Sequence, residues 1–307
     1  MQYHMVHLVS IKHQIVQFHM THVEPSVDRL SALLERFHVR AHLFHAGPLC
    51  GVSSFAAEPG RGFMHVLRRG EMVVTHRRSD KVQQKIEVRE PTLLFYPRPL
   101  THAFHNAPVD GADFVCATLD FQGGDCHPLV RSLPSLLVFP LRQVEGLEAS
   151  LQLLFGETER VRCGQRILAD RMFEVVLLQV LRWLLDHPQA GGIDVGLIAG
   201  LCDPALARAL TALHETPGAS WSLEAMAQQA GTSRSAFAAR FKRIVGQTPA
   251  DYLADWRLSI AQSQLIQGHS VKFIADALGY ANASALSRVF AQRLGRSPRE
   301  WMQSRTR

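Results

Sequence analysis

A short motif that occurs twice near the end of the chain constrains the fold more than any other feature. The copies begin at Ser222 and Ser270 and read SLEAMAQQAGTSRSAFAARF and SVKFIADALGYANASALSRVF. Three marked positions of the first copy have counterparts in the second: Ala227, Gly231 and Phe241 recur as Ala275, Gly279 and Phe290. The alanine and glycine pairs are 48 residues apart and the phenylalanine pair 49, so the second copy has one extra residue in its turn.

The spacing of these residues predicts two helix-turn-helix units. A small residue is needed where two helices cross, and glycine is favoured where the chain leaves the first helix with positive φ. Apolar residues then line the inner face of the second helix, which leaves its outer face free for the major groove of DNA. One match is weak evidence, because any pair of helices can imitate it. Two matches at a nearly constant offset indicate a DNA-binding domain.

A longer helix is predicted between the two copies. Thr248 and Pro249 are typical of an N-cap and a first helical position, and Gly268 of a helix end. Apolar residues recur between them at helical spacing: Leu253, Trp256, Ile260, Ala261 and Leu265. Such a helix is about 27 Å long, close to the roughly 34 Å between successive major-groove faces. This length suits two recognition helices that enter successive grooves on one side of the duplex.

The region resembles the DNA-binding domain of the AraC/XylS transcription regulators. The residues that carry the resemblance are Pro249, Tyr252, Arg257, Ala261, Leu265, Ile274, Ala275, Gly279, Tyr280, Phe290, Gly295, Ser297, Pro298 and Trp301. The resemblance covers residues 217–307. It implies seven helices in two helix-turn-helix subdomains, with double-stranded promoter DNA and RNA polymerase as partners. The chain departs from the family after Phe290, where Ala291 and Gln292 follow in place of the usual basic or amide residue.

We expect the outer faces of the two recognition helices to contact DNA. The predicted contact residues are Arg234, Ser235, Ala238, Ala239, Arg240 and Lys242 in the first unit and Ala283, Ser284, Ser287 and Arg288 in the second. Most are small, so mainly Arg234 and Arg288 are expected to reach base edges. Residues 217–307 contain 12 Lys and Arg against 5 Asp and Glu, a net charge of +7, and the remaining residues carry −1 of the total of +6. Attraction to phosphates requires such a distribution.

The length and composition indicate two domains in a reducing compartment. A chain of 307 residues has ample material for two cores. It has no run of 18 apolar residues, so no membrane span is predicted, and five cysteines without framework spacing fit the cytoplasm. No P-loop, nucleophile elbow or zinc-finger spacing occurs, and no cofactor is predicted. Residues 1–24 hold five of the 16 histidines and predict an unstructured leader or a mis-assigned start upstream of Met20, with a metal-binding tail as the alternative.

A domain rich in short strands is predicted from Pro25 onward. Ser26 is expected to cap a helix that runs to about Phe37. Strand-like runs follow at 39–45, 51–56, 62–67, 71–76, 83–88, 92–96 and 112–119. Many short strands with frequent turn residues predict an antiparallel barrel or sandwich. The chain as a whole is therefore assigned to the α+β class.

The strand-rich region resembles the cupin sensor domain of the same regulators. The match consists of HVLRRG from His65, EPTLLFYP from Glu90, and His102 with Asn106 four residues on. Metal-dependent cupin enzymes carry a second histidine two residues after the first, but Leu67 stands there in this chain, so no metal is predicted. The resemblance implies an effector pocket inside the barrel, lined by Arg40, His65, His102 and His105.

Three interpretations of the barrel histidines remain open. They are ordinary half-buried residues, they line a ligand pocket, or His65 and His102 share a metal with Cys116 or with Cys126 and His127. A pocket with an arginine and histidines would favour an acidic or hydroxylated effector, because these groups donate hydrogen bonds to oxygen.

Residues 144–187 have helical spacing and indicate contact with a partner chain. The helix around 167–185 is apolar over most of its circumference, so it is buried or shared with a second subunit, and we expect a homodimer. Asp203 and Pro204 are typical of the start of the next helix. The predicted parts are the leader 1–24, a cupin-like effector-binding and dimerisation domain 25–190, a linker 191–202 and the DNA-binding domain 203–307.

The sequence therefore predicts a cytoplasmic, sequence-specific transcription regulator that a small-molecule effector controls by population shift. Two alternatives are a cupin-type metal-dependent enzyme and a regulator whose barrel only dimerises. The incomplete metal motif and the tandem DNA-binding motif oppose the enzyme.

Overall fold

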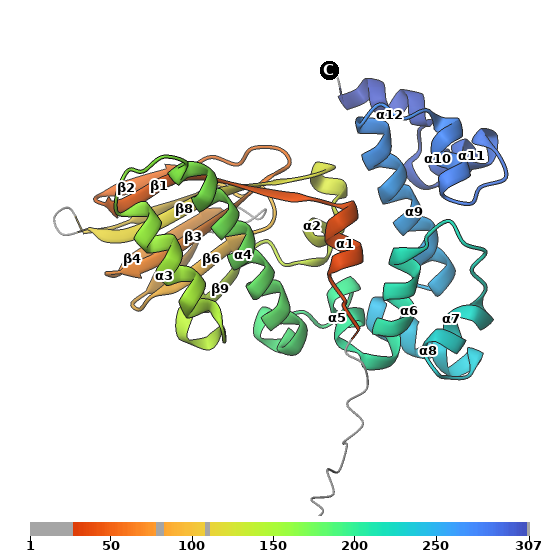
Figure 1. The fold of residues 1–307 in the computed structure, drawn as a ribbon, viewed down its shortest axis with the longest axis horizontal. Coiled ribbons are helices and arrows are strands. Elements are labelled where there is room, and N and C mark those ends of the chain that lie inside the picture. Colours follow the sequence, from red (N-terminus) through yellow and green to blue (C-terminus); the bar gives the residue numbers. More distant parts are fainter. Residues whose placement is uncertain (1–26, 78–82, 108–110, 306–307) are drawn as a thin grey trace, which may run out of the picture.

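The computed structural model describes residues 27–77, 83–107 and 111–305 and has two parts (Figure 1). A strand-rich part extends to helix α4, and a helical part begins at α5 (Figure 1). The predicted leader and the predicted cap Ser26 lie outside the described residues. Within the described part of the chain, no helix has the length and hydropathy of a membrane-spanning segment.

Nine strands build the first part within the described residues. They are β1 (Val39–Leu49), β2 (Val52–Phe55), β3 (Arg61–Arg69), β4 (Met72–Arg77), β5 (Gln83–Val88), β6 (Thr92–Tyr96), β7 (His102–His105), β8 (Ala112–Phe121) and β9 (Leu137–Pro140). Seven of them coincide with the predicted strand runs. Strands β7 and β9, of four residues each, were not predicted from the sequence.

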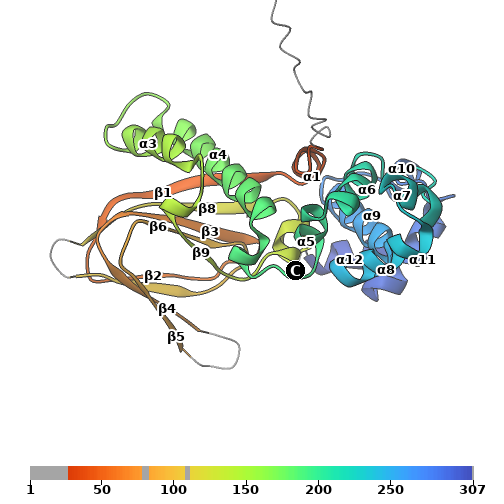
Figure 2. The ribbon, with the colours of Figure 1, turned by 90° about the horizontal axis from the view of Figure 1, so that it is seen from below.

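The strands form two antiparallel sheets that pack face to face, as the sequence predicted (Figure 2). The first sheet has the order β1-β8-β3-β6-β9 and the second the order β2-β7-β4-β5. Alternate residues of β3, β6 and β8 point to opposite faces of the first sheet. Phe63, Leu67 and Phe114 belong to the core between the sheets, whereas Met64 and Val66 face the opposite way, toward the helices.

Helices α3 (Leu147–Thr158) and α4 (Gln165–Asp186) cover the outer face of the first sheet (Figure 2). The buried side of α4 packs there through Phe173 and Val176. Asp170 of α4 also accepts a hydrogen bond of 2.6 Å from the backbone N–H of Leu43. Because β1 is an edge strand, this carboxylate satisfies a donor that would otherwise lack a strand partner.

The first helix is shorter than predicted. Helix α1 runs from Ser31 to Arg36, and its start is organised by Asp28, whose carboxylate accepts a hydrogen bond of 3.1 Å from the backbone N–H of Ser31. The prediction of a helix beginning near Ser26 was therefore wrong in its start. Further along, α2 (Pro128–Ser132) and the 3-10 turns η1 (Gly124–Cys126) and η2 (Leu141–Gln143) flank β9.

The segment predicted as a linker contains structure. The turn η3 (Pro188–Gly191) leads to helix α5 (Leu197–Cys202), whose residues from Leu197 to Leu201 are buried. Helix α5 packs on the helices that follow it, and it is drawn below α1 and α2 in Figure 1. The stretch 191–202 is thus not an open spacer but largely part of the core.

Seven helices follow within the described residues, the number that the family resemblance implied. They are α6 (Pro204–Glu215), α7 (Leu223–Gln229), α8 (Arg234–Val245), α9 (Pro249–Ile266), α10 (Val271–Ala277), α11 (Ala283–Leu294) and α12 (Pro298–Arg305). Asp203 and Thr248 cap α6 and α9, as predicted. Helix α9 connects the group α6–α8 to the group α10–α12 (Figure 1).

Candidate nucleic-acid interface and sensor core

The two sequence repeats fold as helix-turn-helix units, α7 with α8 and α10 with α11. Ala227 and Ala275 are buried, as expected of small residues at a helix crossing. Gly231 and Gly279 have φ of +66° and +73°, the left-handed conformation that the sequence predicted. Each of the four helices begins at a side chain that accepts a backbone N–H bond: Ser222, Ser233, Ser270 and Asn282.

Of the six contact residues predicted for α8, Ala238 is half-buried. The other five are exposed: Arg234, Ser235, Ala239, Arg240 and Lys242. The guanidinium of Arg234 lies 3.8 Å from the carboxylate of Glu224, and both side chains are largely exposed. Such a pair contributes little to stability, so Arg234 remains available for DNA.

Arg240, also a predicted DNA contact, has a partner within the protein. Its Nη2 lies 2.6 Å from Oδ2 of Asp203, the residue that caps α6, so its charge is neutralised within the protein. Arg243 also lies on the outer face of α8, although it was not predicted as a contact residue. It is exposed and lies one turn beyond Ala239 on the same face of α8, and within the described residues it has no ion pair. Its spacing of four from Ala239 was the signal.

The second recognition helix, α11, presents a small polar face. Ser284 and Arg288 are exposed, while Ala283 and Ser287 are half-buried. Within the described part of the chain, the guanidinium of Arg288 has no hydrogen bond or ion pair. It is therefore free to bind an acceptor from outside the protein.

A hollow with a volume of about 620 Å³ lies between the two units. Helix α8 lines it with Ala238, Ala239 and Lys242, and the second unit lines it with Tyr280 and Val289. Helix α9 forms its floor. Three of the six contact residues predicted for α8 thus line the hollow that the second unit shares.

Arg257 of α9 fixes the arrangement of the two units. Its guanidinium donates hydrogen bonds of 2.7 and 2.9 Å to the carbonyl oxygens of Pro217 and Ala219, in the turn before α7. It also lies over the ring of Tyr280, 5.6 Å from the centroid. This cation–π contact and these hydrogen bonds connect the first unit, α9 and the second unit.

In the strand-rich part, the structure brings together two of the four predicted effector residues. Nε2 of His65 lies 2.9 Å from Nε2 of His102, and both residues are buried. Nδ1 of His102 donates to the carbonyl oxygen of Leu100 at 2.8 Å, so Nε2 of His102 accepts the proton of His65. Nδ1 of His65 is then an unprotonated acceptor, and it is buried without a partner among the described residues.

Aromatic rings surround this histidine pair and fill the space between the sheets. The rings are those of Phe44, Phe55, Phe63, Tyr96 and Phe104. Burial lowers the pKa of His102 to about 4 and holds the pKa of His65 well below its ordinary value, an effect that the neighbouring His102 increases. Both histidines are thus neutral at neutral pH. Both histidine side chains are buried among aromatic rings, in line with the first of the three interpretations, whereas Phe44 at the edge of the group is 44% exposed.

The other two predicted effector residues lie elsewhere. Arg40 is exposed at the start of β1, opposite Asp120 of β8, and it is not among the side chains that surround the histidine pair. His105 is exposed on the outer face of the second sheet, where its Nε2 lies 2.9 Å from the hydroxyl of Thr75. An odd spacing from His102 puts the two on opposite faces of β7.

The residues named in the metal interpretation have other surroundings in the structure. In the described residues, no group of three or more His, Cys, Asp and Glu is arranged to hold a metal ion. Cys116 is buried, which raises the pKa of its thiol. Both ring nitrogens of His127 are occupied: Nε2 donates to the carbonyl oxygen of Phe37 at 3.0 Å, and Nδ1 accepts from the backbone N–H of Leu129 at 3.2 Å.

The strand-rich and helical parts share one continuous hydrophobic core. At their junction the rings of Phe37 and Trp256 meet with centroids 5.2 Å apart. Arg36 donates hydrogen bonds of 2.9 and 2.7 Å to the carbonyl oxygens of His214 and Glu215, at the end of α6. A helix end has carbonyl groups without intrahelical partners, so this arginine connects the two parts directly.

Comparison with known proteins agrees with both parts. A family model described as Cupin matches residues 28–186, and one described as Helix-turn-helix domain matches residues 226–304. A putative AraC-like transcription regulator of Streptomyces lividans is 30% identical over 306 residues, which cover 91% of this chain and 98% of that protein. The regulator AlkR of Acinetobacter baylyi is 30% identical over 57% of this chain and 58% of its own length. The solved DNA-binding domain of AdpA in complex with a target DNA is 28% identical, with a TM-score of 0.30, and covers 33% of this chain and 92% of that chain.

Proposed function

The chain belongs to the AraC-like DNA-binding transcription regulators, and we propose that it places α8 and α11 in two successive major grooves of its promoter. The observation that carries this proposal is the pair of helix-turn-helix units on either side of α9, whose recognition helices carry exposed basic residues. Helix α9 has 18 residues and so a length of about 27 Å, somewhat less than the roughly 34 Å of one turn of the duplex.

Selection of bound sequences from a random duplex library, followed by footprinting, tests this proposal. We expect each protein chain to protect two short segments with centres roughly 10 base pairs apart, on one side of the duplex. Protection of one segment alone would mean that only one unit reads DNA. Binding without any sequence preference would contradict the proposal as a whole.

Arg288 is the residue of α11 that we expect to read a base. Its exposed guanidinium has the geometry for two parallel hydrogen bonds to guanine. Arg288→Ala is expected to weaken binding to the selected sequence by about 1–3 kcal/mol and to relax the preference at one base pair. The measurement is a titration of wild type and variant against the selected duplex and a scrambled duplex.

Arg299→Ala is the matched control for this prediction, because Arg299 is an exposed arginine of α12, outside the two recognition helices. It should leave the base preference unchanged. Equal losses for Arg288→Ala on the selected and scrambled duplexes would assign Arg288 to a phosphate contact instead.

The exposed face of α4 supports a homodimer. Leu168, Val175 and Leu178 are 45%, 45% and 41% exposed, although the same helix buries its other side on the sheet. Together with Arg171 and Arg182 they recur at alternating spacings of three and four, the pattern of a helix that packs along a second helix. The proposed partner is therefore α4 of a second copy of the chain.

Leu178→Glu is expected to weaken the dimer, because it replaces an apolar side chain of the contact by a carboxylate that would have to lose its water. Analytical ultracentrifugation of variant and wild type checks this result. Val52→Glu serves as the control, since Val52 is an equally apolar residue, 65% exposed on β2 of the other sheet. A Leu178→Glu protein that remains dimeric would exclude this face of α4.

Four further assignments rest on membership of the family. The regulator is controlled by a small effector, contacts RNA polymerase at its promoter, resides in the cytoplasm with its DNA, and has no enzymatic activity. Transcription in vitro from the selected promoter, with and without candidate effectors, tests the first two. The packed interior around His65 and His102 favours a second candidate, in which the region between the sheets serves only to stabilise a dimer and an effector binds elsewhere.

A further inference from the structure

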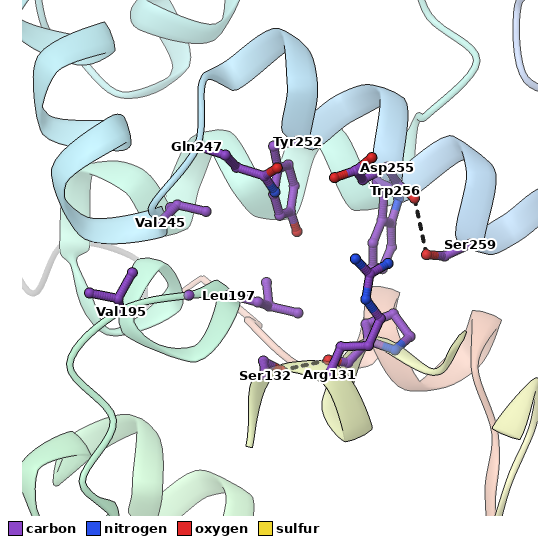
Figure 3. Close-up of a pocket in the computed structure, with 12 residues that line it drawn as sticks. Arg131, Ser132, Val195, Leu197, Val245, Gln247, Tyr252, Asp255, Trp256 and Ser259 are labelled. Atoms are coloured by element: carbon purple, nitrogen blue, oxygen red, sulfur yellow. Dashed lines mark hydrogen bonds between the residues drawn. The ribbon is translucent and has the colours of Figure 1, made fainter. Parts of the chain in front are cut away.

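A cavity of about 210 Å³ lies between the strand-rich part and the helical part (Figure 3). Helix α2 forms one wall with Pro128, Arg131 and Ser132, and α9 forms the wall opposite. Residues 195–197 and the end of α8 close the remaining side. Pockets for drug-sized ligands measure roughly 300–1,000 Å³, so this cavity suits a smaller molecule.

Much of the lining of the cavity is apolar. Val195, Leu197 and Val245 contribute aliphatic surface, and Trp256 contributes its ring. The indole Nε1–H of Trp256 is buried, and within the described residues it has no acceptor. Because this N–H group has almost no accessible surface, the ring offers the cavity its apolar surface, and a ligand with an apolar body is complementary to this part of the lining.

Arg131 adds a positive charge that the protein does not neutralise. Its side chain extends from α2 toward Trp256 and Asp255 (Figure 3). In the described part of the chain its guanidinium has no hydrogen bond or ion pair. The carboxylate of Asp255 is bound instead by Arg293, 3.2 Å away. The free guanidinium therefore favours an anionic ligand group.

Helix α2, which carries Arg131, is fixed at both ends. His127 caps its start by accepting the N–H of Leu129. At its end the guanidinium of Arg98 donates to three backbone carbonyl oxygens, those of Val130, Arg131 and Leu133. Because the backbone is held in place, binding requires only the Arg131 side chain to become ordered, which lowers the entropic cost.

We propose that this cavity binds a small organic monocarboxylate, with its carboxylate on Arg131 and its apolar body against Leu197 and Trp256. The proposal rests on the effector control proposed above and names the site and the ligand class. A guanidinium and a carboxylate form two parallel charge-assisted hydrogen bonds, which fixes the orientation of the ligand. A ligand in this position contacts α2 and α9 together, so it favours the arrangement in which the two parts are packed as observed.

Calorimetric titration of the full-length protein, without DNA, tests the site. The probes are benzoate and hexanoate, with benzamide and hexanamide as neutral molecules of the same shape. We expect saturable binding of at least one carboxylate and affinities at least about tenfold weaker for its amide. Arg131→Gln should reduce carboxylate affinity to the level of the amide. Gln247→Glu, which places a negative charge on the cavity wall, should also weaken carboxylate binding but leave amide binding unchanged.

Arg160→Gln is the matched control, since Arg160 is an exposed arginine beyond the end of α3 and does not line the cavity. It should bind the carboxylates like wild type. Absence of saturable binding by both carboxylates, equal binding of carboxylate and amide, or unchanged binding by Arg131→Gln would each overturn the proposal. Binding of the same preparations to the selected duplex is measured separately. If the wild-type protein binds the selected duplex but no carboxylate, only this site is ruled out. If the wild-type protein does not bind DNA with sequence preference, the proposed function is ruled out.

Discussion

Lowering the pH from about 7.5 to about 5 is expected to reduce the free energy of unfolding by about 6 kcal/mol, through three buried histidines. Burial lowers the pKa of His102 and of His127 to about 4 and that of His214 to about 3. In the unfolded chain each histidine regains a pKa of about 6.5 and takes up a proton below that pH. The folded state does not, so each histidine favours unfolding by about 2 kcal/mol at about pH 5.

The sign of this effect is fixed by the direction of the shifts. When the pKa of a histidine is lower in the folded state, the protein begins to lose stability as the pH falls through the pKa of the unfolded state. The loss continues until the pH reaches the pKa of the folded state. The window therefore extends from about pH 6.5 to about pH 4. Because the total stability of a typical protein is only about 5–15 kcal/mol, we expect the protein to be marginally stable or unfolded near pH 5. Urea denaturation at a series of pH values checks this prediction.

A single substitution separates the histidine contribution from the general effect of acid. His127→Asn keeps an acceptor at the cap of α2 but removes the titrating ring. It should reduce the difference in stability between the two pH values by about 2 kcal/mol. The exposed histidine His38 supplies the control, because His38→Asn should leave that difference unchanged. Equal stability of wild type at about pH 7.5 and about pH 5 would contradict the prediction.

The second large effect is expected at Gly279, the turn glycine of the second helix-turn-helix unit. A Cβ at this position would lie 2.2 Å from the carbonyl oxygen of Gly218, and the backbone φ of +73° is strained for any side chain. Gly279→Ala is therefore expected to destabilise the protein by about 2–5 kcal/mol, the sum of the cost of the left-handed conformation and the cost of overpacking. The clash is with backbone, which cannot move aside as a flexible side chain can.

Gly231 provides the matched control, because it occupies the same turn of the first unit with φ of +66°. A Cβ there would meet only the end of the Arg208 side chain, at 3.4 Å. Gly231→Ala should thus cost only about 1–2 kcal/mol. Denaturant unfolding of both variants, followed by titration with the selected duplex, measures the difference. If the two substitutions cost the same, the close approach of Gly218 to Gly279 does not occur in solution.

The sequence by itself determined the helical part almost completely. Helix starts, crossings and turns depend on residues a few positions apart, and Ser222, Gly231 and Thr248 form the local interactions that their types predict. The inner positions of the helices are equally local in origin, since Phe237 and Phe241 are buried at a spacing of four. The same holds for the seven strands that the sequence predicted.

Only the tertiary structure decided which side chains are free and which are occupied. Arg240 and Arg288 were both predicted to contact DNA, but Asp203, the cap of α6, forms an ion pair with the first, and within the described residues the second has no such partner. The packing of side chains between the two sheets likewise depends on contacts between residues far apart in the chain, such as His65 with His102. The same is true of the cavity beside Arg131. Periodicity specifies which face of an element is buried. It does not specify what packs against that face, because that is set by the arrangement of all the elements together.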